Sequence, residues 1–461
     1  MKWTVLFLVG IGLMGRFSIG PPEIPVFAVS LYAVSRLIQV LGRDIPILES
    51  TSVIYCLQLL IGPVISYWSP PQFARYQMAI DAEVYFAYVI PAVCVYLIPI
   101  AIARDRLPYL TQVMGFQAGR RVFTAGLVIC LIGFSASLVE NYVPASLRFL
   151  AFLVGELKYV GALYCYFCRH GQRRWVLATV MILTVVSSLA NAMFHQLILW
   201  GLITLSLVIY RESRRNTRGL RIGLVCLGFF ALITLQSYKD EYRDAIRMNP
   251  SAGIVENLGT AVAMGTFEGD TALEVIAVRL NQGWIVSNVL KHVPAREPFA
   301  GGDTLLEAMR DSLLPRVLFD KAARGGGREN FRRFTGLQIS SNTSMGISPV
   351  GETYANLGVD GGIAAMFGYG IIFSGFYYFL TTRRNLGVLF LLWIPAVFSQ
   401  ALKSETELTV VLNHLVKAGV FCWFTYVVIH QILFGRLQVP MEQRPVQPEH
   451  GGGQGQRHVR S

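Results

Sequence analysis

The sequence predicts an all-α integral membrane protein, a bundle of about twelve transmembrane helices with one large external loop that contains short helices. Hydrophobic residues make up 53% of the 461 residues and charged residues only 15%, and the mean hydropathy is +0.49. That composition is too apolar for a soluble domain. The apolar residues also gather into runs near the length of about 20 residues that crosses a bilayer.

Twelve apolar runs are candidate spans, and they divide the chain into four parts. The first nine runs form an N-terminal bundle over residues 1–236, and the last three lie in residues 353–435. Residues 237–352 are the large loop between them, and the proline- and glycine-rich tail, 436–461, is predicted to be disordered. The runs are 3–19, 24–42, 50–67, 83–103, 121–140, 145–167, 174–192, 194–210, 219–236, 353–380, 386–402 and 408–435.

The arginines in the connectors predict the orientation of the bundle. In the twelve-span arrangement the arginine-rich connectors fall on one side, which the positive-inside rule makes cytoplasmic. Both termini are then cytoplasmic, and the 237–352 loop is external. The net charge of +12 therefore reports membrane orientation, and no nucleic-acid partner is expected. These arginines are Arg104, Arg106, Arg120, Arg121, Arg169, Arg173, Arg174, Arg211, Arg214, Arg215, Arg218, Arg221, Arg383 and Arg384.

The sequence lacks the motifs of several common classes of catalytic and metal site. The chain has no Walker-type phosphate loop, no HExxH, no GxSxG and no cluster of histidines and acids at metal-ligand spacing. All seven cysteines lie within apolar runs, so they are predicted to pack in the core rather than form disulfides. We therefore expect neither a bound metal nor another cofactor.

The loop carries a cationic segment with six basic residues against two acids, Asp320 and Glu329. One interpretation is a solvated surface beside lipid headgroups. The other is a clamp for phosphate or pyrophosphate, because arginine makes two parallel bonds to phosphate oxygens and lysine adds a compact charge. The sequence alone leaves both open. The six residues are Arg316, Lys321, Arg324, Arg328, Arg332 and Arg333.

A new apolar helix is predicted to follow Ser348 and Pro349, and Glu352 lies near its start. A carboxylate there can complement the helix dipole, pair with an arginine or accept a proton from a sugar hydroxyl. Gly358 and Gly362 have the small-xxx-small spacing that lets membrane helices approach closely.

Within the loop, Thr304 and Glu307 have the spacing of a capping box. The sequence therefore predicts a short helix that begins at Thr304 and ends before Pro315.

The order of several short motifs resembles the Wzy-type oligosaccharide repeat-unit polymerases, also called O-antigen or exopolysaccharide polymerases. The resemblance covers the external loop and the helix after it, about a quarter of the chain. The motifs are Arg279-Leu280, Val293-Pro294, Pro298-Phe299-Ala300-Gly301-Gly302, Leu314-Pro315-Arg316, Lys321 and the run from Gly351 to Gly361, GETYANLGVDG.

The resemblance implies a glycosyltransferase of the bacterial inner membrane that polymerises undecaprenyl-pyrophosphate-linked repeat units at the periplasmic face. It implies catalytic roles for Arg279, Arg316, Lys321 and Glu352, and substrate contacts for Tyr354 and Asn356. Preorganised cations can stabilise the pyrophosphate leaving group by a route that needs no metal. A flippase and a chain-length regulator are the implied partners. Leu357 departs from the family, in which an aromatic residue often follows the asparagine. The remaining candidates for substrate binding are the cations Arg324, Arg328, Arg332 and Arg333.

Two other function classes stay open on the sequence. An O-antigen ligase-type transferase also uses a large external loop with cations, but the Glu-x-Tyr-x-Asn-x-Gly run favours a polymerase. A non-enzymatic transporter of lipid-linked glycans would be expected to place its polar residues along a cavity at the midplane of the membrane. Here the polar residues are densest in the loop.

Overall fold

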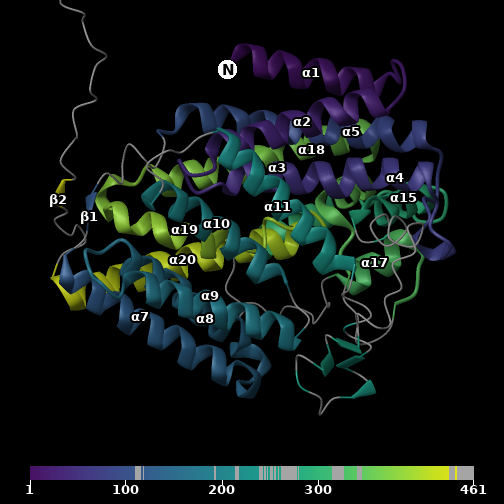
Figure 1. The fold of residues 1–461 in the computed structure, drawn as a ribbon. Coiled ribbons are helices and arrows are strands. Elements are labelled where there is room, and N and C mark those ends of the chain that lie inside the picture. The colour runs from purple at the N-terminus through teal and green to yellow at the C-terminus, as the bar shows by residue number, and fades with distance from the viewer. Residues whose placement is uncertain are drawn as a thin grey trace, which may run out of the picture.

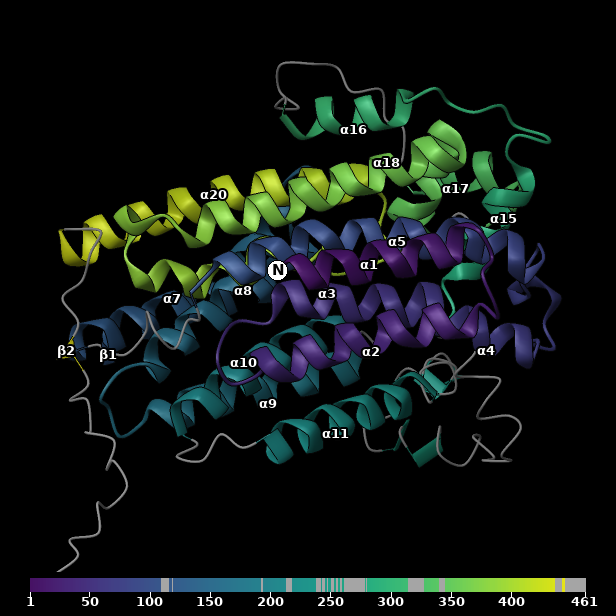
Figure 2. The same ribbon diagram turned by 90° about the horizontal axis from the view of Figure 1, so that it is seen from above.

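The all-α prediction is confirmed over the residues that the computed structural model describes. These are 1–108, 116–117, 119–191, 194–212, 218–237, 281–313, 327–339, 345–435 and 442–443, with single positions between 242 and 280. Among them the one strand pairing is antiparallel, between β1 (Phe116–Gln117) and β2 (Glu442–Gln443). The predicted disordered tail lies outside the described residues except for β2. The long helices run side by side along one axis (Figures 1 and 2).

Eight helices in the described part of the chain are long and apolar enough to cross a membrane. The second of the eight, Ile47–Trp68, joins α3 (Ile47–Cys56) to α4 (Gly62–Trp68) through a π-helical turn. The other seven are α2 (Glu23–Val40), α5 (Ala82–Arg106), α7 (Arg120–Val139), α8 (Ala145–Tyr166), α9 (Arg173–Asn191), α18 (Ser348–Thr381) and α20 (Leu408–Phe434).

The remaining four predicted spans are helical but are not among these eight. α1 (Lys2–Arg16) has 15 residues, fewer than a span needs. The run at 386–402 contains only a short 3₁₀ segment, Val388–Trp393, followed by α19 (Ile394–Phe398). The other two runs are α10 (His195–Glu212) and α11 (Arg218–Ser237). The described residues thus support a helical bundle with eight membrane-length helices and do not establish a count of twelve.

Three shorter helices belong to the predicted loop: α15 (Gly283–His292), α16 (Asp303–Leu313) and α17 (Arg328–Thr335). α15 and α17 gather at one end of the bundle, whereas α16 lies beside α20 and α18 (Figure 2). α18 begins at Ser348, so the last five residues of the predicted loop are helical.

The segment before α15 is anchored in the irregular turn between α3 and α4. A π-helical turn shifts the backbone hydrogen bonds of a helix and exposes a carbonyl group, and here the Gln58 carbonyl accepts the Gln282 amide at 3.0 Å. Asn281 is fully buried and donates to the Ser66 hydroxyl at 2.7 Å. A Cβ on Gly62 would lie 2.7 Å from the Leu280 carbonyl oxygen, so only glycine leaves room for this segment.

α5 and α18 pack closely through glycines. A Cβ on Gly362 would lie 2.7 Å from the Tyr88 hydroxyl, and one on Gly370 would lie 2.6 Å from the Tyr96 carbonyl oxygen. The close-packing role predicted for Gly362 is confirmed, because a side chain here would meet the buried Tyr88 hydroxyl.

Gly358 has a different role: it breaks α18. Its φ of 71° and ψ of −162° are outside the helical region and belong to a conformation that is essentially restricted to glycine. The break frees helical carbonyls, and two of them are satisfied by another segment. The Ala355 carbonyl accepts the Ala300 amide at 3.0 Å, and the Asn356 carbonyl accepts the Gly301 amide at 3.0 Å. The first ten residues of α18 therefore form a separate head that is held against residues 300–301.

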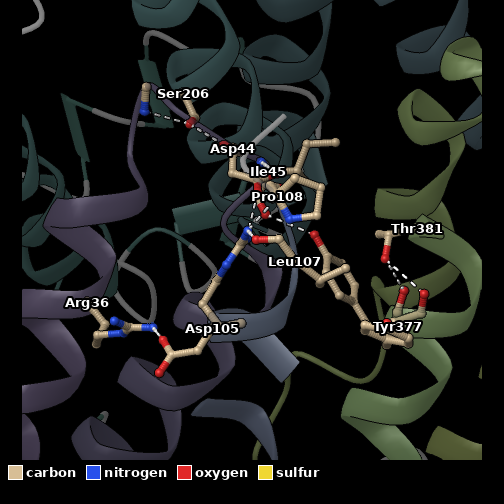
Figure 3. Close-up of polar contacts among 12 residues, drawn as sticks. Arg36, Asp44, Ile45, Asp105, Leu107, Pro108, Ser206, Tyr377 and Thr381 are labelled. Atoms are coloured by element: carbon tan, nitrogen blue, oxygen red, sulfur yellow. Dashed lines mark hydrogen bonds and ion pairs between the residues drawn. The ribbon is translucent and has the colours of Figure 1, made fainter. Parts of the chain in front are cut away.

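At the end of the bundle opposite α15 and α17, the turn between α2 and α3 is fixed by buried polar contacts (Figure 3). Asp44 pairs with Arg104 at 2.6 Å, and both side chains are buried. The Asp44 carbonyl accepts the Ser206 hydroxyl at 2.7 Å, and the Tyr377 hydroxyl donates to the Ile45 carbonyl at 3.3 Å. The contacts join α5, α10 and α18 at one turn. Arg104, predicted only as part of a basic connector, is here a core residue.

We predict that Gly358→Ala destabilises the protein by about 1–3 kcal/mol, because alanine is strained at this backbone conformation. Its Cβ would also lie 3.3 Å from the Phe299 ring. Thermal unfolding in detergent measures the effect. The control is Gly368→Ala in the same helix, where a Cβ meets nothing within 4 Å and alanine is the better helix former. Equal melting temperatures for the two variants would show that the break is not required.

Candidate functional site

Glu352 lies in the head of α18 and is fully buried. Its Oε1 accepts the Thr304 hydroxyl at 3.2 Å, and its Oε2 accepts the Leu408 amide at 2.8 Å. Thr304 belongs to α16 and Leu408 is the first residue of α20. One carboxylate therefore joins the N-terminal ends of three helices, which come from distant parts of the sequence.

Asn356 lies one helical turn after Glu352 and completes this contact. Its amide nitrogen donates to the Thr304 hydroxyl and to the Glu352 carbonyl, each at 2.7 Å. Its amide oxygen accepts the Thr304 backbone amide at 3.3 Å, which satisfies a free N–H at the start of α16. We call Glu352, Asn356, Thr304 and Leu408 the carboxylate knot.

Tyr354 points away from the knot. Its hydroxyl donates to the Val293 carbonyl at 3.2 Å, and its ring lies edge-on to Tyr88 and Phe299, with ring centroids 5.2 and 5.8 Å away. The ring is buried, so in this structure it packs the head of α18 against its neighbours.

A second buried carboxylate, Glu407, precedes Leu408 and holds the end of the cationic segment. Its Oε2 accepts the Gly327 amide at 3.0 Å and the Asn330 side-chain amide at 3.2 Å. Gly327 immediately precedes α17. Two consecutive residues thus connect the start of α17 to the carboxylate knot, Glu407 through its side chain and Leu408 through its backbone.

Burial raises the pKa of Glu407 from 4.5 to about 7, because a carboxylate loses hydration when it is enclosed. The hydrogen bonds from Asn330 and Gly327 act in the opposite direction, since they stabilise the ionised form. Glu407 therefore changes its charge near neutral pH.

The cations of α17 lie on its accessible sides, while Phe331 and Phe334 are buried. Arg328 is half-buried and Arg332 is exposed one turn later, so the two share a face of the helix. Arg333 pairs with Glu297 at 2.6 Å on another face. Arg279, Arg316, Lys321 and Arg324 lie outside the described residues; the last three belong to the segment that connects α16 to α17.

An apolar groove of about 360 Å³ lies between α18 and α20. Its walls include Ile372 and Phe379 from α18 and Leu412 and Val416 from α20. These are two of the helices whose N-terminal ends meet at the carboxylate knot.

The family model of a domain of unknown function, DUF8712, matches residues 84–378, which is more than half of the chain. The chain belongs to this family. The DUF8712 region includes Thr304, Glu352 and Asn356, whereas Glu407 and Leu408 lie beyond it. The knot of this DUF8712 member is therefore completed by one residue outside the matched domain, Leu408. No curated protein and no solved structure matches the chain.

The structure corrects the role predicted for Thr304 and adds Glu407. The capping-box prediction is wrong, because the Thr304 hydroxyl bonds to Glu352 and Asn356 across the fold. Glu407 was missed because it lies at a span end, where acidic residues are common, and nothing local distinguishes it. Among the described residues, no group of three or more His, Cys, Asp or Glu could hold a metal ion.

We predict that Thr304→Val lowers stability by about 1–3 kcal/mol, because Glu352 Oε1 and the Asn356 amide both lose a buried hydrogen-bond partner. The control is Thr381→Val, since that hydroxyl donates only to carbonyls of its own helix. Thermal unfolding of both variants in the same detergent makes the comparison, and an equal loss would contradict the importance of the knot.

Glu407→Gln is expected to change how stability depends on pH. Folded protein keeps a proton on Glu407 up to a pKa of about 7, whereas the unfolded chain releases it near 4.5. Stability therefore falls as the pH rises through this window, by up to about 1.4 kcal/mol per pH unit. Glutamine cannot ionise but still accepts both hydrogen bonds, so the variant should lack this loss. Melting curves from pH 5 to 8 that run parallel for variant and wild type would contradict the assignment.

Proposed function

We propose that this protein is a membrane glycosyltransferase that polymerises undecaprenyl-pyrophosphate-linked oligosaccharide repeat units. The observation that carries the proposal is the convergence of the carboxylate knot and the cationic helix α17, joined through Glu407 and Leu408. A transferase of this kind needs a carboxylate for the acceptor hydroxyl and cations for the pyrophosphate.

The polarity of the helices supports a site at the external face. α5 begins near the knot, where the Tyr88 hydroxyl donates to the Val350 carbonyl at 2.7 Å, and ends at the exposed Arg106. α18 also begins at the knot and is followed by Arg383 and Arg384. Because basic residues favour the cytoplasmic side, this arrangement favours a periplasmic knot. The twelve-span count, the periplasmic 237–352 loop and two cytoplasmic termini are part of the proposal.

The contact between Thr304 and Glu352 suggests how an acceptor sugar would bind. In the structure, a hydroxyl donates to Glu352 Oε1, as the acceptor hydroxyl would before it loses its proton. In the proposed reaction this sugar hydroxyl replaces Thr304, Glu352 accepts its proton, and the oxygen attacks the sugar carbon bonded to the pyrophosphate. The sugar–pyrophosphate bond breaks, and its electron pair leaves with the pyrophosphate.

The cations are proposed to receive that leaving group. Arg279, Arg316 and Lys321 carry the catalytic part of this role, and Arg324, Arg328, Arg332 and Arg333 bind the remaining phosphate charge. The apolar groove between α18 and α20 offers a surface for part of the lipid tail, since the same two helices form the knot.

The test uses purified full-length protein in nanodiscs with a cognate lipid-pyrophosphate-linked repeat unit, with products followed on a gel. We expect a ladder of polymer, and a loss of at least about 100-fold in rate for Glu352→Gln and for Arg316→Ala, the usual scale for general acid–base or charge-stabilising groups. Arg174→Ala is the matched control, because Arg174 is an exposed cation that pairs with Glu212 on α10, away from the knot.

The products also separate the alternative functions. Transfer of a finished glycan to a different acceptor, without a ladder, would identify a ligase. Movement of the lipid-linked unit across the membrane without a new bond would identify a transporter. Normal polymer from Glu352→Gln would remove the proton-acceptor role.

A further inference from the structure

α16 has three distinct faces along its eleven residues. Residues in an α-helix are about 100° apart, so positions three and four apart share a face. Thr304, Ala308 and Ser312 follow this spacing and are buried, and α16 packs against α20 and α18. This face holds the helix on the bundle (Figure 2).

The two remaining faces differ sharply in chemistry. One carries large apolar side chains that the protein leaves uncovered: Leu306 is 61% exposed, Met309 42% and Leu313 72%. We call these three residues the α16 stripe. The other face carries exposed charged residues, including Glu307 and Arg310. A helix with this division is suited to a boundary between lipid and water.

Exposed apolar side chains also lie beside the start of α16. Phe299 and Leu357 lie beside the start of α16 and are 42% and 41% exposed. A Cβ on Gly302 would lie 4.0 Å from Leu357, and Phe299 packs against Gly358. Farther along α18, a membrane-length helix, further apolar side chains such as Phe367 and Ile371 are exposed.

We propose that α16 is a lipid-contacting helix, with the α16 stripe inserted among bilayer lipids and its charged face turned to the headgroups and water. The partner is lipid because the stripe follows the exposed Leu357 and Phe299 beside a membrane-length helix, and because the charged residues lie on a separate face of α16. The inference rests on the membrane placement of α18 and α20 and does not require the polymerase reaction.

This contact bears directly on the carboxylate knot. Thr304 is two residues before the α16 stripe and donates to Glu352, while Asn356 bonds to the same threonine. Lipid that holds α16 in place therefore also holds the Thr304 hydroxyl that donates to Glu352. The knot is thereby kept at the bilayer surface, where a lipid-linked substrate would arrive.

Site-directed spin labelling of the full chain in phosphatidylethanolamine/phosphatidylglycerol liposomes tests the inference. Single cysteines replace Leu306 and Met309 on the stripe, and the matched control is Glu307→Cys on the charged flank of the same helix. The one exposed cysteine among the described residues, Cys226, is changed to serine in every variant. All labelled positions are exposed, so labelling leaves the core unchanged. Labels are probed with oxygen, which is enriched in lipid, and with a water-soluble nickel chelate.

The oxygen-to-nickel accessibility ratio should be several-fold higher at the two stripe positions than at Glu307→Cys. A ratio that is equal at all three positions would place the stripe in water and overturn the inference. Low accessibility to both reagents at the stripe would show a protein partner instead and would also overturn it. Because the readout needs no turnover, its failure is distinguishable from failure of the proposed function.

Discussion

The site depends on the break in α18 at Gly358. In a membrane-embedded bundle every buried backbone group needs a partner inside the protein, so a helix can be interrupted only where another segment satisfies the freed groups. Residues 300–301 do this by donating to the Ala355 and Asn356 carbonyls. The break therefore fixes the segment before α16, which brings Thr304 to Glu352. Glycine at 358, the loop and the carboxylate form one linked arrangement.

Two neighbouring residues then connect this arrangement to the cationic helix. Leu408 contributes only its backbone amide to Glu352, while Glu407 contributes a buried carboxylate to Gly327 and Asn330. Because the two are consecutive, a single peptide unit separates the contacts of α17 from those of Glu352. Burying the carboxylates of Glu352 and Glu407 is unfavourable unless hydrogen bonds such as these compensate for the lost hydration.

The opposite end of the bundle is built differently. There the buried pair of Asp44 and Arg104 and the contacts of Ser206 and Tyr377 fix a turn between two helices. A buried ion pair costs desolvation, and its members need further hydrogen bonds to offset that cost. These residues lock the ends of α5 and α18, the helices that begin at the knot. The end with the buried ion pair and the end with the carboxylate knot are thus the two ends of the same helix pair.

The sequence by itself determined the all-helical class, all eight membrane-length helices of the described residues, the close packing at Gly362 and the position of Glu352 and Asn356 near a helix start. These features follow from local composition and spacing, which determine hydropathy and helix contacts. Only the tertiary structure decided that Gly358 breaks the helix, that Thr304 bonds to Glu352 rather than capping its own helix, and that Glu407 holds α17. Each of these depends on partners about fifty to eighty residues away in the chain, and no local pattern records such a partner.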